Sequence, residues 1–233
     1  SLPMTHAIAL VDSNQDIVFP LSALLKDEGY FVETYTDGDV ALGSLRRRPV
    51  NLVISDIVLP RMGGLEFLRN LRSKDNVPVI FLTDVADEVD EVIALHMGAD
   101  DYIKKPFSRR LLLERIRAIL RRQELASREI AGTEILRRGD LALDPSRHLC
   151  TWKDQKVSLT ATEFLLTVAL AQRPGHVKNR NQLMDAAYGK NFCVSDRTID
   201  SHIKRLRIKF KEITPDFSAI ETLYGVGYRF CGV

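Results

Sequence analysis

The first half of the chain alternates between two hydrophobic patterns, and this alternation limits the folds that it can adopt. Short apolar runs typical of buried strands are separated by stretches whose apolar residues recur at helical spacing. Five strand–helix alternations in about 120 residues indicate an α/β fold, a doubly wound sheet of five parallel strands. The predicted strands lie near residues 7–11, 31–35, 51–55, 78–82 and 101–103.

Polar or charged residues stand at or just beyond the ends of four of these strands. They are Asp12, Asp56, Thr83 and Lys105. Because open α/β sheets bind ligands at the carboxyl edge of their strands, we expect these side chains to meet in one crevice. Two carboxylates, a hydroxyl and an ammonium suit a transient aspartyl phosphate, with Asp56 as the nucleophile and Asp12 as a metal ligand. The alternative is that Asp56 is a loop carboxylate that caps the next helix.

Charge is unevenly distributed along the chain. Residues 1–122 carry 16 Lys and Arg against 18 Asp and Glu, whereas residues 133–233 carry 16 against 11. An acidic first half and a basic second half suggest regulation at one end and nucleic-acid binding at the other. No apolar run approaches the roughly 18 residues that a membrane span needs, so we expect a cytoplasmic protein without membrane contact.

The pattern changes after residue 122. Residues 123–132 show no clear amphipathic stripe and end in Gly132, which predicts a linker that is partly helical at its start. We therefore predict one domain over residues 4–122 and a second over residues 133–233. Short strands with turn signals open the second domain, and three helices and a hairpin follow. The helices are expected near residues 160–172, 180–188 and 196–211.

The last of these helices has one apolar stripe, formed by Ile199, Ile203, Leu206 and Phe210. A buried stripe with a basic, hydroxyl-bearing opposite face suits a helix that lies in the major groove of DNA. The alternative is a solvated amphipathic helix that binds nothing. The candidate DNA contacts on its other faces are Arg197, Thr198, Ser201, His202, Lys204 and Arg205.

The first half resembles the flavodoxin-like receiver domain of two-component response regulators. The matching motifs are Val11-Asp12, Asp56-x-x-x-Pro60-x-Met62-x-Gly64, Leu82-Thr83, Gly98-Ala99-Asp100-Asp101-Tyr102 and Lys105-Pro106-Phe107. The resemblance implies that a sensor histidine kinase phosphorylates Asp56 with the help of Mg²⁺, held by Asp12, Asp56 and the backbone carbonyl of Val58. It also implies that Thr83 moves toward the phosphoryl group, that Tyr102 turns inward, and that Lys105 pairs with the phosphoryl oxygens.

Three positions depart from the receiver pattern, and at one of them Gly63 replaces the usual Asp or Asn. Ser13 stands where a second acid usually helps to bind Mg²⁺, so we expect weaker metal binding. Asp84 replaces a small residue and adds negative charge beside the phosphoryl site. An alternative is therefore an atypical regulator whose receiver is a phosphorylation-independent dimerisation module and whose second domain still binds DNA. We do not expect an enzyme of the phosphatase kind, because no second acid is placed beside Asp56 as a general acid.

Receivers of the OmpR/PhoB subfamily, which the second half of the chain also resembles, usually form two-fold dimers through salt bridges on the fourth helix, fifth strand and fifth helix. Residues that match this face predict a homodimer, although Glu91 and Leu111 stand where another ion pair is usual. The alternative is a solvated surface whose charges contribute little. The matching residues are Asp100, Asp101, Arg115 and Arg122.

The second half resembles the winged helix-turn-helix domain of OmpR/PhoB-type regulators, and its wing is similar to that of ChvI-type regulators. The matches include Leu159-Thr160-x-x-Glu163-Phe164, Arg197-Thr198-Ile199-Asp200-x-His202-Ile203-x-x-Leu206-Arg207 and Thr222-x-x-Gly225-x-Gly227-Tyr228-Arg229. Arg207 and Tyr224, which stands where the wing often carries an arginine, join the candidate DNA contacts. The resemblance implies a transcription regulator whose partners are promoter DNA, a sensor histidine kinase, RNA polymerase and a second copy of the chain.

Overall fold

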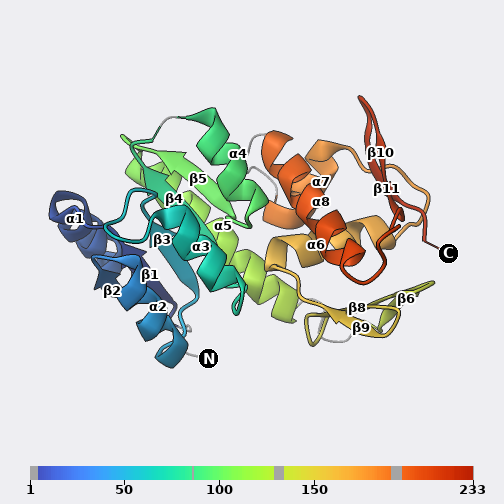
Figure 1. Ribbon diagram of the computed structural model, residues 1–233, viewed down its shortest axis with the longest axis horizontal. Coiled ribbons are helices and arrows are strands. Elements are labelled where there is room, and N and C mark those ends of the chain that lie inside the picture. Colours follow the sequence, from blue (N-terminus) through green and yellow to red (C-terminus); the bar gives the residue numbers. More distant parts are fainter. Residues whose placement is uncertain (1–4, 86, 129–133, 190–195, 233) are drawn as a thin grey trace. The chain divides into compact units, whose positions relative to one another are not determined.

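The computed structural model describes residues 5–85, 87–128, 134–189 and 196–232 (Figure 1). The chain divides into two compact units, residues 1–112 and 113–233, and each has a core of its own. No helix within the described ranges is long and apolar enough to cross a lipid bilayer.

The first unit is built on a parallel sheet with strand order β2-β1-β3-β4-β5 (Figure 1). This confirms the predicted five-stranded α/β fold. The connection from β2 to β3 crosses β1, which therefore lies between them and pairs with both, so the ends of β1 and β3 are neighbours. The strands are β1 (Ala7–Val11), β2 (Phe31–Tyr35), β3 (Leu52–Ser55), β4 (Val79–Thr83) and β5 (Asp101–Lys104).

Helices connect these strands, and three of them begin at a side-chain cap. Asn14, Asp37 and Asp87 each accept a hydrogen bond from a backbone N–H of the first turn, as capping residues do. Helices α2, α3 and α4 pack their apolar side chains on one face of the sheet. The helices are α1 (Gln15–Asp27), α2 (Gly38–Arg47), α3 (Gly64–Arg72), α4 (Glu88–His96) and α5 (Arg109–Arg128).

Helix α5 continues six residues beyond the predicted end of the first domain at residue 122. The added residues Gln123, Glu124, Leu125 and Ala126 are good helix formers, so nothing in their backbone preference stops the helix. The remainder of the predicted linker, residues 129–132, lies outside the described residues. The domain boundaries at residues 122 and 133 stay a prediction.

The second unit begins with a four-stranded antiparallel sheet, followed by three helices and a two-stranded wing. The predicted stripe of Ile199, Ile203, Leu206 and Phe210 is buried in the core of this unit. The elements are β6 (Leu136–Arg138), β7 (Leu141–Asp144), β8 (Leu149–Trp152), β9 (Gln155–Val157), α6 (Ala161–Ala171), α7 (Arg180–Tyr188), α8 (Asp196–Lys211), β10 (Ile220–Leu223) and β11 (Gly227–Phe230).

The wing, β10 and β11, is anchored to the segment that precedes α7. Lys178 and Tyr228 exchange two backbone hydrogen bonds of 2.8 and 2.9 Å. A Cβ atom on Gly227 would lie 2.0 Å from the Lys178 carbonyl oxygen, so only glycine allows this approach. At the other strand, the Arg207 guanidinium donates to the Ile220 carbonyl at 2.9 Å and to the Thr222 hydroxyl at 2.7 Å. Arg207 therefore joins α8 to the wing.

Candidate functional site

Three of the four predicted strand-end residues contact one another at the carboxyl edge of the parallel sheet. The Lys105 ammonium lies 3.1 Å from Asp12 Oδ2 and 3.3 Å from Asp56 Oδ2. All three side chains are largely buried, with exposures of 5%, 4% and 12% for Lys105, Asp12 and Asp56. An ammonium between two enclosed carboxylates supplies the positive charge that their burial requires.

Strand register explains this meeting. β1 and β3 pair with Val11 opposite Ser55, and the Asp56 N–H donates to the Val11 carbonyl at 2.9 Å. The next residues, Asp12 and Asp56, therefore emerge side by side. The loop after Asp56 returns so close to its own start that residue 64 must be glycine, because a Cβ atom there would lie 2.4 Å from the Asp56 carbonyl oxygen.

The charge of Lys105 is stabilised by its two neighbours. Burial alone disfavours the ammonium, but hydrogen bonding and charge attraction from Asp12 and Asp56 outweigh this effect and raise the pKa of Lys105 above its ordinary value. Lys105 is therefore a permanent cation at this edge of the sheet. It can balance anionic phosphoryl oxygens as readily as carboxylates.

Thr83 and Tyr102 are linked through a single residue, Val85. The buried Thr83 hydroxyl accepts the Val85 N–H at 3.3 Å, and the Tyr102 hydroxyl donates to the Val85 carbonyl at 2.9 Å. Tyr102 is 8% exposed, so its ring already points inward in this conformation. Burial, and then the charges of nearby acids that include Asp90 and Glu91, raises the pKa of Tyr102 to about 12.

The two carboxylates are compatible with Mg²⁺. This ion commonly takes one or two protein carboxylates and completes its shell with water and phosphate oxygens. Among the described residues, no cluster of three or more His, Cys, Asp or Glu side chains could hold a metal ion. Ser13 is exposed and adds no carboxylate, which agrees with a site of few protein ligands. Asp84 is also exposed, so water screens its charge from the site.

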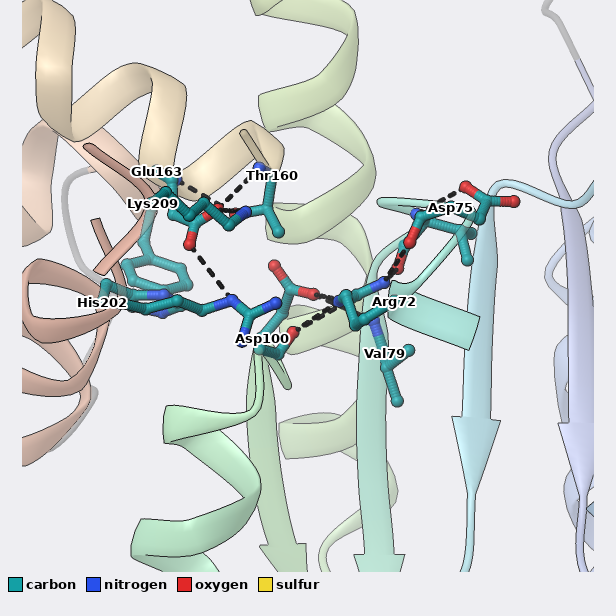
Figure 2. Close-up of polar contacts among 12 residues, drawn as sticks. Arg72, Asp75, Val79, Asp100, Thr160, Glu163, His202 and Lys209 are labelled. Atoms are coloured by element: carbon teal, nitrogen blue, oxygen red, sulfur yellow. Dashed lines mark hydrogen bonds and ion pairs between the residues drawn. The ribbon is translucent and has the colours of Figure 1, made fainter. Parts of the chain in front are cut away.

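The candidate dimer residues are mostly turned into the protein. Asp100 is 1% exposed and accepts hydrogen bonds from the Val79 N–H at 2.9 Å and from Arg72 at 3.3 Å (Figure 2). Its carboxylate therefore joins the starts of β4 and β5 to the end of α3, and its part in the predicted dimer interface stays a prediction. Asp101 and Arg122 are buried, and Arg115 is half-buried.

The candidate DNA contacts divide by exposure. Lys204 on α8 is exposed, and Tyr224 at the wing tip is 93% exposed. Three residues expected on the DNA-facing side are buried instead, and His202 Nε2 lies 2.8 Å from the Tyr188 hydroxyl. Arg207 is committed to the wing. The three buried residues are Thr198, Ser201 and His202, and the side chain of Arg197 lies outside the described residues.

Sequence reasoning missed the role of Glu163, a carboxylate with 0% exposure. It accepts the Thr160 N–H at 2.8 Å as part of a capping box at the start of α6, and it pairs with Lys209 and Arg205 of α8 (Figure 2). The Thr160-x-x-Glu163 spacing signals the cap. The two cations come from a distant segment, so only the fold reveals that Glu163 joins α6 to α8.

Comparisons with known proteins agree with this geometry. Residues 8–117 match the family model "Response regulator receiver domain", and residues 154–230 match "Transcriptional regulatory protein, C terminal". The chain is 35% identical over 228 residues to the sensory transduction protein RegX3 of Mycolicibacterium smegmatis, covering 97% of this chain and 99% of that one. It is 38% identical over 229 residues to the transcriptional regulatory protein CreB of Escherichia coli, covering 98% and 99%.

Solved structures share the fold over the whole chain. A single-residue mutant of RitR has a TM-score of 0.83 and covers 98% of this chain and 100% of its own, but its identity of 23% supports the fold alone. The response regulator DrrB of Thermotoga maritima, described as an OmpR/PhoB homolog, has a TM-score of 0.51 and 29% identity, with 98% and 100% covered.

Proposed function

Because the chain belongs to the OmpR/PhoB-type response regulators, two-component transcription regulators that join a receiver to a winged-helix domain, we propose that phosphorylation of Asp56 is its switch. The observation that carries this proposal is the contact of Lys105 with both Asp12 and Asp56. Such a site holds a nucleophilic carboxylate, a second carboxylate and a fixed cation at the sheet edge where ligands bind.

The chemistry is a phosphoryl transfer. An Asp56 carboxylate oxygen forms the new bond to phosphorus as the bond from phosphorus to the histidine nitrogen of the kinase breaks. Lys105 turns from the carboxylates to the phosphoryl oxygens and stabilises their charge. Mg²⁺, when bound, would neutralise further charge and would be held by Asp12, Asp56 and the Val58 carbonyl. The leaving imidazole takes its proton from water.

The signal leaves the site through Val85. When the Thr83 hydroxyl turns to a phosphoryl oxygen, it gives up the Val85 N–H, and the Val85 carbonyl is the acceptor of Tyr102. A change at Thr83 therefore alters the backbone that holds Tyr102, and with it the surface formed by α4 and β5. We propose that this surface, with Asp101 and Arg115, forms the homodimer.

DNA is the output partner. We propose that α8 lies in the major groove of promoter DNA, with the exposed Lys204 at a phosphate or base edge, and that Tyr224 of the wing contacts the sugar–phosphate backbone. In this scheme a sensor histidine kinase supplies the phosphoryl group and RNA polymerase reads the bound promoter, both in the cytoplasm. The names of RegX3 and CreB support this scheme.

The decisive test is the mass of the intact protein after incubation with Mg²⁺ and acetyl phosphate. We expect one added phosphoryl group on the natural chain and none on Asp56→Asn, which keeps the shape of the side chain. The phosphorylated protein should also bind promoter DNA more tightly. Absence of an adduct, under conditions that modify a standard receiver, would contradict the proposal.

One observation favours a second candidate function. Lys105 already satisfies both carboxylates, and Ser13 offers no acid to attract a metal ion. A receiver that remains in this state would act as a phosphorylation-independent dimerisation module beside a DNA-binding domain. A natural chain that dimerises and binds its promoter as tightly before acetyl phosphate treatment as after it would support this alternative.

A further inference from the structure

Arg61, in the loop between Asp56 and α3, has an unusual backbone conformation. Its φ of 65° lies in the left-handed region that favours glycine. The Met62 N–H donates to the Pro60 carbonyl at 2.7 Å, so the chain makes a γ-turn around Arg61. A γ-turn with a positive φ at its centre is the rarer and more strained of the two forms. Strained residues of this kind persist where surrounding contacts hold them, often beside functional sites.

The contact that holds Arg61 is an ion pair with Asp37. Arg61 Nη2 donates to Asp37 Oδ2, and Asp37 Oδ1 accepts the Val40 N–H at 2.9 Å as the cap of α2. The Asp37 side chain is only 7% exposed, although Arg61 is 73% exposed. The Val40 N–H first, and the Arg61 guanidinium after it, keep the pKa of Asp37 below its ordinary value. The strained turn is thus fixed to the N-terminus of a neighbouring helix.

This ion pair completes the support of the loop that carries Asp56 and Val58. Asp56 is fixed to β1 by its N–H bond to the Val11 carbonyl at 2.9 Å, and the Gly64 N–H holds the Ile57 carbonyl at 2.7 Å. Between these points the backbone bends outward, and Val58 is 64% exposed. The bond between Arg61 and Asp37 ties the outer part of the loop to α2.

We propose that Arg61 and Asp37 are a positioning pair for the metal-dependent phosphorylation site. Their ion pair fixes residues 58–61, and therefore the direction of the Val58 carbonyl relative to the Asp56 carboxylate. Ser13 withholds one carboxylate from Mg²⁺, so binding of the ion depends more strongly on these loop oxygens. This inference rests on the proposed function, and the two residues act through the loop backbone rather than on the reacting atoms.

The test compares full-length Asp37→Asn and Arg61→Gly with the natural chain. Asparagine still caps α2, and glycine relieves the strain at φ 65°, so both variants remove the ion pair without harming the local fold. We expect the Mg²⁺ concentration for half-maximal phosphorylation by acetyl phosphate to rise about tenfold, as for other residues that orient metal ligands. The rate at saturating Mg²⁺ should change less than about twofold, because the chemistry itself is intact.

A measurement on metal-free protein tests the loop directly. Amide hydrogen exchange at Val58 and Met62 should become faster in both variants and stay near natural in Arg61→Lys, which keeps the charge. The matched control is Arg48→Gly, because Arg48 is also 73% exposed and pairs with Glu33 away from the loop. This control should change neither the exchange nor the Mg²⁺ dependence.

The outcomes separate the inference from the proposed function. A natural chain that takes no phosphoryl group at any Mg²⁺ concentration overturns the proposed function and the inference with it. Normal phosphorylation with an unchanged Mg²⁺ dependence in Asp37→Asn and Arg61→Gly overturns the positioning pair alone. Unchanged exchange at Val58 and Met62 would likewise show that the ion pair does not hold the loop.

Discussion

Lys105 is the residue on which the charge balance of the receiver site depends. It separates two enclosed carboxylates, Asp12 and Asp56, that would otherwise face each other without a cation. Removing one member of such a group costs more than the group contributes as a whole, because the remaining charges stay buried and unpaired. Lys105 therefore serves both the stability of the domain and its chemistry.

Lys105→Met should show both effects. We expect the free energy of unfolding to fall by about 3 kcal/mol in urea at low Mg²⁺, because two carboxylates lose their counter-charge. Added Mg²⁺ should recover part of this loss in the variant, since the ion brings positive charge to the same oxygens. Phosphorylation should slow strongly. A variant as stable as the natural chain without Mg²⁺ would contradict this account of Lys105.

His148 makes the second unit sensitive to acid. Its ring lies 4.2 Å from the ring of Phe164, and burial, aided by the charge of Arg122, lowers the pKa of His148 in the folded state. The unfolded chain binds a proton near pH 6.5, whereas the folded chain binds it only at lower pH. The contribution of His148 to stability is therefore fully present above about pH 6.5 and is lost as the pH falls below that value.

The measurement is urea unfolding at about pH 7.5 and about pH 5.5, on either side of the ordinary histidine pKa, followed by the fluorescence of Trp152, the single tryptophan. The natural chain should lose more free energy of unfolding between these pH values than His148→Phe, which cannot be protonated at this position. Equal losses of unfolding free energy in the two proteins would show that protonation of His148 does not cause the loss of stability at low pH.

At the scale of elements, α8 and the wing act together because Arg207 and Glu163 tie α8 to its neighbours. Arg207 bonds to β10, and Glu163 joins the start of α6 to Lys209 and Arg205. Basic residues on one helix therefore have different tasks. Some hold the domain together, and others, such as the exposed Lys204, remain at the surface.

Salt dependence of DNA binding should distinguish these tasks. Lys204→Ala removes a phosphate contact, so the slope of log affinity against log salt concentration should decrease by about 1. Arg207→Met should leave that slope almost unchanged, but it should lower the free energy of unfolding by about 2 kcal/mol, because charged hydrogen bonds to the wing are lost. The reverse pattern would place Arg207 on DNA and Lys204 in the scaffold.

At the scale of the whole molecule, phosphorylation and self-association should be coupled. Phosphorylation of Asp56 should tighten dimerisation by about 5- to 150-fold, the range expected for linked sites. Sedimentation velocity with and without acetyl phosphate measures this change, and Asp56→Asn is the control. Equal association under both conditions would favour the phosphorylation-independent module.

Much of the fold could be predicted from sequence because hydrophobic periodicity and the polar residues at strand ends are features of short, local segments. They located the five strands and the meeting of Asp12, Asp56 and Lys105. They could not find the bond of Arg61 to Asp37, because it joins segments whose approach depends on tertiary packing. Helical periodicity likewise gave the stripe of α8 but not the neighbours of its other faces, so the bond of His202 to Tyr188 was missed.

The link between Thr83 and Tyr102 runs through the main chain of Val85, one amide on one side and one carbonyl on the other. Every residue type except proline offers both groups. Evolution can therefore vary position 85 widely while the mechanical connection survives. A comparison of side chains at position 85 would therefore not reveal the role of this residue, and among the substitutions only proline would remove the N–H that the link needs.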